Sequence, residues 1–251
     1  MIFFGTAGWD YPDWAGRVYP KPKPKGFDPL AYLAEYVDTV EINSTFYRPP
    51  TKAVARAWAK RVEHRKDFLF TAKLYRRFTH ERKTAFTAEE VKEVRQGFDA
   101  LADAGVLGAV LLQFPWSFRN EEANREWLND VTHAFKAYPL ALEVRHESWN
   151  EPAFYAELSS RGIGFVNIDQ PLYKNSIKPS ARATSPIGYV RVHGRNFRDW
   201  FRKAAGRDER YDYLYTAKEL QPWAERTREL ASDPSVEKVF VVNNNHFQGK
   251  A

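Results

Sequence analysis

Short apolar segments alternate with amphipathic, helix-like stretches along the whole chain, and this alternation constrains the fold more than any other feature. Strands are predicted over residues 3–7, 39–43, 67–73, 109–114, 140–146, 164–169, 188–193 and 238–245. Alternating strands and helices indicate a parallel sheet. Eight such strands in 251 residues fit a TIM barrel, which needs about 250 residues, so residues 1–251 are predicted to form one (β/α)8 domain.

Helical patterns fill most gaps between these strands, over residues 28–36, 51–63, 87–104, 121–137, 151–161 and 217–232. Thr51 suits an N-cap, and Thr87 with Glu90 has the spacing of a capping box. The sixth connection, residues 170–187, contains three prolines and is predicted to be mostly loop. The sequence stops at Ala251, so either the last helix is missing from this chain or the barrel closes without it.

An open, doubly wound sheet is the alternative fold. It needs a glycine-rich phosphate turn after an early strand, and residues 5–9 (GTAGW) do not match that pattern.

Polar residues near the strand ends carry the functional prediction. Side chains of a barrel strand alternate between the helix layer and the interior, so apolar residues at alternate positions place the polar ones inside. The inward residues are then Glu41, Asn43, Lys73, Gln113, Glu143, Arg145, Asn167, Asp169, Arg191, His193, Asn244 and His246. Active sites of TIM-barrel enzymes lie at the C-terminal mouth, where we predict a polar, partly cationic site.

The same charges can be interpreted as an ion-pair plug that ties the barrel shut, because buried charges must pair with something. The two interpretations predict different effects of substitution. For a site, Glu143→Gln and Arg191→Ala should abolish ligand binding or turnover with little loss of stability. For a plug, they should unfold the protein without an effect on ligand.

A divalent metal is a further alternative. Carboxylate and imidazole ligands suit Mn²⁺, Zn²⁺ or Mg²⁺, and the candidates are Glu41, Glu143, Asp169, His193 and His246. The neighbouring lysine and arginines would repel a cation, and no cofactor is required by the sequence. The chain has no cysteine, which excludes disulfides, thiolate catalysis and Cys-ligated zinc.

Aromatic and basic residues lie just beyond the strand ends. Rings such as Trp9 and Tyr47 can stack on sugars or bases, or can pack the loops onto the rim. Residues 194–210 are rich in arginine, and TIM barrels often bind phosphate with the loops after strands seven and eight. The net charge of +6 permits attraction to phosphorylated ligands or nucleic acid. No signal peptide or long apolar run is present, so we expect a cytoplasmic protein without membrane contact.

Several motifs resemble one family. They are GTAGW at 5–9, TVEINSTFYR at 39–48, LLQFP at 111–115, EVRHESW at 143–149, RVHG at 191–194, YDYLY at 211–215 and NNH at 244–246. In this order, from residue 5 to the C-terminus, they are similar to the YecE-like family (domain of unknown function 72). The resemblance implies a TIM barrel and no established reaction. The chain departs from the family pattern at Asn243, where an aromatic residue is usual, and in its missing last helix.

The first functional hypothesis is an enzyme, isomerase-like or hydrolase-like, that acts on a phosphorylated or sugar-like anionic small molecule. Glu41, Glu143, His193 and Asp169 are the expected catalytic acids and bases. The expected ligand-binding residues are Trp9, Asn43, Tyr47, Lys73, Gln113, Arg145, His146, Trp149, Arg191, Arg195, Asn244, Asn245 and His246. The alternatives are a nucleic-acid-binding or phosphodiester-acting protein, and a non-catalytic binding protein on a barrel scaffold.

Overall fold

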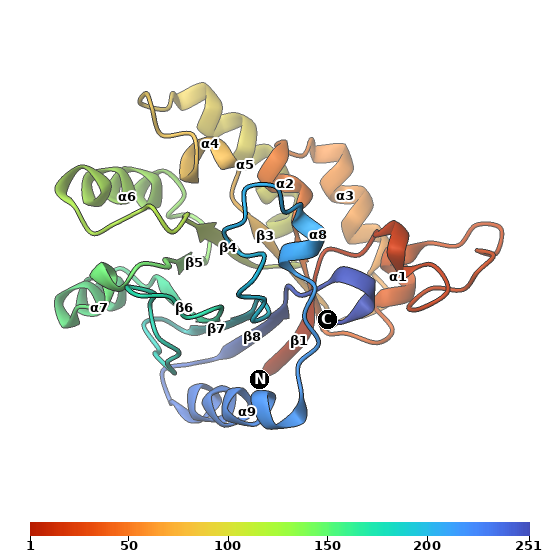
Figure 1. Cartoon of the computed structure of the whole chain (residues 1–251). Helices are drawn as coiled ribbons and strands as arrows, with labels where there is room; N and C mark the ends of the chain where they lie inside the picture. The colour runs from red at the N-terminus through yellow and green to blue at the C-terminus, as the bar shows by residue number, and fades with distance from the viewer.

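Eight parallel strands close into a barrel in which each strand pairs with its neighbours along the chain and the last pairs with the first (Figure 1). This computed structural model describes residues 1–251 apart from the side chain of Arg207. In that described part the strands are β1 (Ile2–Ala7), β2 (Thr39–Ile42), β3 (Leu69–Lys73), β4 (Leu107–Gln113), β5 (Leu140–Glu143), β6 (Gly164–Asp169), β7 (Ile187–Val192) and β8 (Lys238–Asn243). The predicted TIM-type barrel is confirmed.

The helices surround the barrel (Figure 1). The longer ones are α3 (Lys52–Arg61), α5 (Ala88–Asp103), α6 (Glu122–Ala134), α7 (Pro152–Ser160) and α9 (Ala217–Ser232). The shorter ones are α1 (Pro29–Leu33), α2 (Ser44–Tyr47), α4 (Arg76–Thr79) and α8 (Arg207–Arg210), with 3-10 turns η1 (Pro12–Trp14), η2 (Glu147–Trp149) and η3 (Phe247–Gly249). Among the described helices, none is long and apolar enough to cross a membrane.

Two helices begin at the predicted capping residues. The Thr51 hydroxyl accepts a hydrogen bond from the Val54 amide at the start of α3. At the start of α5, the Thr87 hydroxyl accepts from the Glu90 amide at 3.2 Å, and the Glu90 carboxylate accepts from the Thr87 amide at 2.7 Å. The predicted capping box is therefore confirmed.

The sixth connection contains no helix in the described chain, as predicted, and its backbone is fixed against β6 by side-chain bonds. Asn167 Oδ1 accepts from the Ser180 hydroxyl at 2.7 Å and from the Arg182 amide at 2.8 Å. The Thr184 hydroxyl accepts from the Phe165 amide at 2.8 Å. After β8 the described chain forms only the short turn η3, and pairing of β8 with β1 closes the barrel without a last helix.

One predicted orientation is wrong. The alternation of polar and apolar residues predicts that Asn167 and Asp169 lie inside the barrel, but the strand register pairs Ile168 with Arg191 and Asp169 with Val192. Residues paired across neighbouring parallel strands share a face, so Ile168 shares the face of Arg191, and Asn167 and Asp169 take the opposite one. Their polar side chains serve the outer layer, where a loop stands in place of a helix.

The barrel interior changes from apolar to polar toward the C-terminal mouth. The rings of Phe3 and Phe240 stack with centroids 5.2 Å apart, and Tyr189 packs beside Phe240 at 5.9 Å. The Tyr189 hydroxyl then lies 3.0 Å from Glu41 Oε2, at the beginning of the charged layer. The aromatic layer thus supports the charged groups from below.

Candidate functional site at the barrel mouth

Buried charges centred on Arg191 form a cluster in the upper barrel. From β7, Arg191 Nη2 lies 2.6 Å from Glu41 Oε1 and its Nε lies 2.9 Å from Glu41 Oε2, which is a bidentate pair. Its Nη1 also donates to Glu143 Oε2 on β5. All three side chains are buried, and they link β2, β5 and β7 across the barrel.

Glu143 extends this cluster to further groups. Its Oε1 lies 2.7 Å from Arg145 Nη2 and 3.3 Å from His193 Nε2. The other ring nitrogen of His193 lies 3.0 Å from the side-chain nitrogen of Asn244. The Arg191 cluster therefore consists of Glu41, Glu143, Arg145, Arg191 and His193, which bond to one another, to Tyr189 and to Asn244.

The protonation of this cluster follows from its surroundings. Burial by itself would raise the pKa of Glu143, but the positive charges of Arg191 and Arg145 outweigh it and hold that pKa well below the usual range. Burial lowers the pKa of His193 to about 3, against the attraction of Glu143. His193 is thus a neutral imidazole at neutral pH. Two carboxylates face two guanidinium groups, so the formal charges balance, as the plug interpretation predicts.

A cavity of about 360 Å³ lies at the strand ends beside this cluster. Its walls come from the ends of β3 and β4 and from the loops after β1, β2, β3, β7 and β8. Its lining residues are Tyr11, Asn43, Phe46, Tyr47, Lys73, Arg76, His80, Gln113, Arg210, Tyr211, Asn244 and His246. Of the predicted ligand-binding residues, it brings together Asn43, Tyr47, Lys73, Gln113, Asn244 and His246. The size falls within the range of small-molecule sites, roughly 300–1,000 Å³.

Lys73 and His80 both line this cavity, and both have lowered pKa values. Burial, with the charge of Arg191, lowers the pKa of Lys73 to about 8, although Glu41 and Glu143 oppose the shift. Burial, with the charges of Lys73 and Arg145, lowers the pKa of His80 to about 3. The cavity therefore holds an amine that titrates near neutrality and a neutral imidazole.

Sequence reasoning missed Arg76 and His80. Both follow the end of β3 directly, in the stretch YRRFTH at 75–80, where two arginines and a histidine gather beyond a strand. This concentration of basic residues was the feature of the sequence that could have identified Arg76 and His80 as site residues. Phe46, Arg210, Tyr211 and Tyr11 lie in the loops whose aromatic or basic character was noted, but none was singled out as a site residue.

Residues 3–251 match the family described as "Protein of unknown function DUF72". The chain belongs to the DUF72 family. The resemblance seen in the motifs is therefore confirmed. The DUF72 barrel is 30% identical over 264 residues to the UPF0759 protein YunF of Bacillus subtilis (strain 168), covering 100% of this chain and 91% of YunF.

Solved DUF72 structures have the same fold. A DUF72 family protein from Thermotoga maritima MSB8 matches with a TM-score of 0.84 and 33% identity, over 100% of this chain and 95% of that one. A DUF72 family protein from Enterococcus faecalis V583 matches with a TM-score of 0.84 and 25% identity, over 100% and 91% of the two chains.

Other predicted site residues of this DUF72 barrel lie outside the cavity. Asp169 pairs with Arg195 at 2.9 Å and accepts from the Tyr215 hydroxyl, so both predicted residues belong to a separate cluster at the end of β6. Their predicted roles stay predictions. Trp9 lines a neighbouring hollow of about 450 Å³ that shares Asn43 with the cavity.

Three further predicted residues support loops in this DUF72 structure. Trp149 is buried, and its Nε1 donates to the Phe118 carbonyl at 2.8 Å. His146 Nδ1 lies 2.9 Å from the Ser148 hydroxyl, and Asn245 donates to the carbonyl oxygens of Tyr213 and Lys250. These side chains are used in holding backbone rather than in lining the cavity.

The divalent-metal site considered from the sequence is not formed by the described residues of the DUF72 barrel. Among the described residues, no set of three or more His, Asp or Glu side chains is placed to hold a metal ion. The carboxylates of Glu41 and Glu143 instead face arginines.

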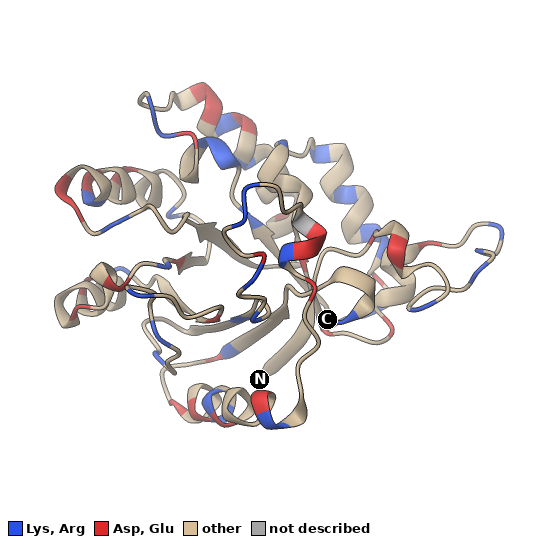
Figure 2. Ribbon diagram, viewed as in Figure 1, with Lys and Arg blue, Asp and Glu red and all other residues tan. Residues whose placement is uncertain are grey.

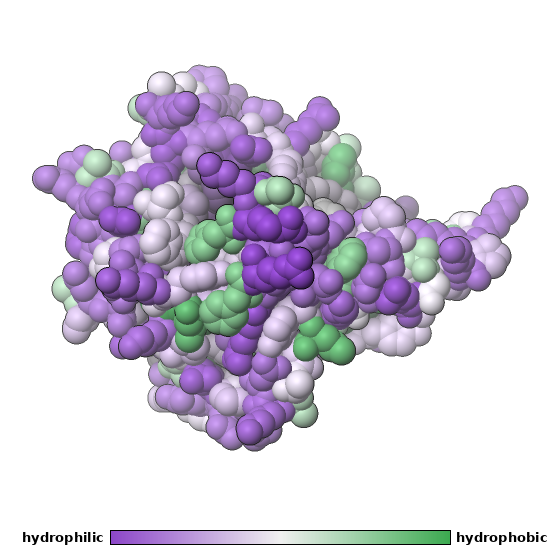
Figure 3. All heavy atoms as spheres, viewed as in Figure 1, coloured by the Kyte–Doolittle hydropathy of each residue, from purple (hydrophilic) through white to green (hydrophobic). Residues whose placement is uncertain are grey.

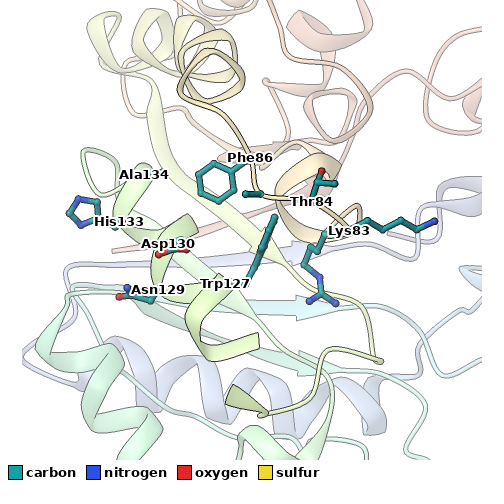
Figure 4. A pocket seen from close by; sticks show the side chains of 10 residues that line it. Lys83, Thr84, Phe86, Trp127, Asn129, Asp130, His133 and Ala134 are labelled. Carbon is teal, nitrogen blue, oxygen red and sulfur yellow. The ribbon is translucent and has the colours of Figure 1, made fainter. Parts of the chain in front are cut away.

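A larger, open hollow of about 700 Å³ lies away from the barrel mouth, between residues 82–86 and α6 (Figure 4). Phe86 and Trp127 meet edge-to-face there, with ring centroids 5.4 Å apart, and Trp127 Nε1 donates to the Phe78 carbonyl at 2.7 Å. The hollow contains none of the predicted site residues, so the barrel-mouth cavity remains the candidate site of this DUF72 protein.

Proposed function

We propose that this DUF72 protein is an enzyme that binds a small phosphorylated or sugar-like anionic molecule in the barrel-mouth cavity. The observation that carries the proposal is the lining of the cavity, which combines the cations Lys73, Arg76 and Arg210 with amide, imidazole and phenol groups. Arginine and lysine bind phosphate or carboxylate oxygens, and the polar groups can bind hydroxyls.

The residues that bind the ligand in this proposal differ from those that hold the strands in place. Glu41, Glu143 and His193 have no exposed surface, and their polar atoms are bonded within the Arg191 cluster and to Tyr189 and Asn244. We therefore assign them a positioning role, in which they fix the strands that carry the cavity side chains. Groups that touch the ligand come from the cavity lining instead.

The alternatives have less support. Of the basic residues between β7 and α9, Arg195 pairs with Asp169, and Arg202 pairs with Asp199 and Glu209, which reduces the charge available to nucleic acid (Figure 2). On the face drawn in Figure 3, hydrophobic residues form small patches among hydrophilic ones. A broad apolar interface, which would favour a non-catalytic binding protein, is not seen among the described residues on that face.

Isothermal titration calorimetry and thermal shift would test the proposal. The ligands are inorganic phosphate, phosphorylated aldoses and ketoses, their unphosphorylated counterparts and a short oligonucleotide. We expect a phosphorylated sugar to bind and raise Tm, and Arg76→Gln or Arg210→Gln to weaken its binding roughly tenfold or more, a loss of about 1.4 kcal/mol.

The matched control is Arg56→Gln, which removes an exposed arginine on α3 outside the cavity. Equal weakening by the control and by the cavity variants would overturn the proposal. So would tight, steeply salt-dependent binding of the oligonucleotide alone.

A further inference from the structure

Lys73 is half-buried and differs from the buried cations Arg145 and Arg191 because, in the described part of the chain, it has no carboxylate partner. Among the described side chains, its Nζ donates to Gln113 Oε1 at 3.1 Å and lies 4.4 Å from the centre of the Phe46 ring, and it forms no ion pair. Lys73 also lines the cavity, where a bound molecule can reach it.

The nearby carboxylates are occupied by arginine. Glu41 faces the guanidinium of Arg191 with both oxygens, and Glu143 is shared between Arg191 and Arg145. The same arginines repel a positive charge on Lys73. Burial and this repulsion favour the neutral amine, which is the nucleophilic form of lysine.

The position of the amine is also fixed. Gln113 Nε2 donates to the Phe114 carbonyl at 2.9 Å, so its Oε1 is directed at Lys73 and can only accept. This acceptor engages one N–H of Lys73. The nitrogen is thereby held at the cavity wall above the Phe46 ring.

We propose that Lys73 Nζ is a catalytic nucleophile that forms an imine with the carbonyl group of an aldehyde or ketone substrate that also carries a phosphate. The inference rests on the proposed function, because it assumes that the anionic molecule binds in this cavity. Arg76 and Arg210, which line the same cavity, are the groups for the phosphate, although Arg76 Nε also pairs with Glu81 at 2.7 Å.

The covalent step balances without a further reactant. The nitrogen lone pair adds to the carbonyl carbon, the C=O electron pair moves to oxygen, and a proton passes from nitrogen to that oxygen to give a carbinolamine. The nitrogen lone pair then forms the C=N bond as the carbon–oxygen bond breaks, and the oxygen leaves as water with the remaining proton of the nitrogen, which gives the neutral imine. These protons move between the reacting nitrogen and oxygen directly or through solvent, because His80, the neutral imidazole in the same cavity, has a pKa of about 3 and is too weak a base to take them up at neutral pH.

Borohydride trapping tests the inference on the wild-type protein. The protein is incubated with glycolaldehyde phosphate or dihydroxyacetone phosphate and reduced with sodium borohydride, and labelled peptides are measured by mass spectrometry. Reduction converts an imine into a stable secondary amine. We expect label on Lys73 at roughly ten times the level on Lys52, an exposed lysine of α3, and competition by inorganic phosphate.

Label on Lys73 no higher than on Lys52 with both probes overturns the inference. If the unreduced probes or phosphate still bind by calorimetry in that case, the proposed function stands and only the imine is wrong. Lys73→Met should lose the specific label, and Lys73→Arg, which keeps the charge, should lose the label but retain phosphate binding. If the wild type shows neither specific label on Lys73 nor binding of the probes or phosphate, the proposed function is rejected as well.

Discussion

Arg191 and Lys73 bring the same charge to the same end of the barrel but have different partners. Arg191 is bonded to Glu41 and Glu143, whereas Lys73 is bonded to the neutral Gln113 amide. Loss of a cation that neutralises two buried carboxylates would leave them unpaired, whereas a cation without a counter-charge can still pair with an anion. The Arg191 cluster and the candidate cavity therefore adjoin at one barrel mouth.

Arg191→Ala should destabilise the protein strongly. The substitution leaves two buried carboxylates without their main partner, and breaking a buried ion pair in this way costs about 3–5 kcal/mol. The free energy of unfolding in urea is the measurement. Arg202→Ala breaks a pair whose arginine is largely exposed, and it should cost less than about 1 kcal/mol. Equal losses for the two variants would contradict the role given to the Arg191 cluster.

Lys73 should react as an amine with an unusually low pKa. Competitive labelling with acetic anhydride over a range of pH measures each amine separately. The reactivity of Lys73 should rise with a midpoint near its pKa of about 8, well below the ordinary lysine value of about 10.4. A midpoint for Lys73 at the ordinary lysine value would show that burial and Arg191 do not act on it as described.

The sequence predicted the polar strand ends but not the division between cluster and cavity. Alternation along a strand tells which residues share a face, so Glu41, Lys73 and Arg191 could be assigned to the interior together. It does not tell which carboxylate each cation will meet. Residues beyond the strand, such as Arg76 and His80, do not follow this alternation, so the sequence does not show which way their side chains point. They were therefore not predicted as site residues.

At the level of elements, β6 shows why alternation alone can mislead. Its polar residues Asn167 and Asp169 were expected inside, as in the other strands. A polar face normally points inward at a barrel mouth because helices cover the outside. Here the connection after β6 is a loop whose backbone needs partners, and Asn167 supplies them. The sequence predicted that no long helix follows β6. It did not show that the polar residues of β6 would therefore face outward, toward the loop.

Gly5 lets β1 approach β2 closely, which gives a prediction on barrel closure. A Cβ at this position would lie 1.7 Å from the Thr39 carbonyl oxygen on the paired strand. Gly5→Ala must therefore separate two strands and should cost about 3 kcal/mol or more. Thermal unfolding followed by circular dichroism measures the loss.

The comparison is Gly105→Ala, which has φ of 71° after α5 and open space around it. This variant should cost only about 1–2 kcal/mol, the penalty for a left-handed alanine. A Gly5→Ala protein as stable as Gly105→Ala would mean that the strands can separate freely.

For the whole molecule, the sequence was most informative about the fold. The periodicity of the chain predicted eight strands, and the observed ones begin and end within a few residues of those limits. Parallel pairing followed from the alternation with helices. The chemistry was less accessible, because it depends on contacts such as that of Arg191 with Glu41, which join residues distant in the chain.

The buried imidazole of His193 makes the stability of the whole barrel depend on pH. Its pKa is about 3 in the folded protein and about 6.5 when unfolded, so between these values the unfolded state binds one more proton. Stability is therefore fully present above about pH 6.5 and is lost as the pH falls toward 3. His80, with a folded pKa of about 3, acts in the same direction.

Urea unfolding at a series of pH values measures this dependence. Below about pH 6, His193 alone should lower the free energy of unfolding by about 1.4 kcal/mol per pH unit. His193→Gln removes the titrating group and should reduce the slope by that amount, even if it lowers stability at neutral pH. His133→Gln, an exposed position on α6, should leave the slope unchanged. A flat profile between about pH 6 and pH 4.5 would mean that His193 is protonated in the folded barrel, and that the Arg191 cluster carries an additional positive charge.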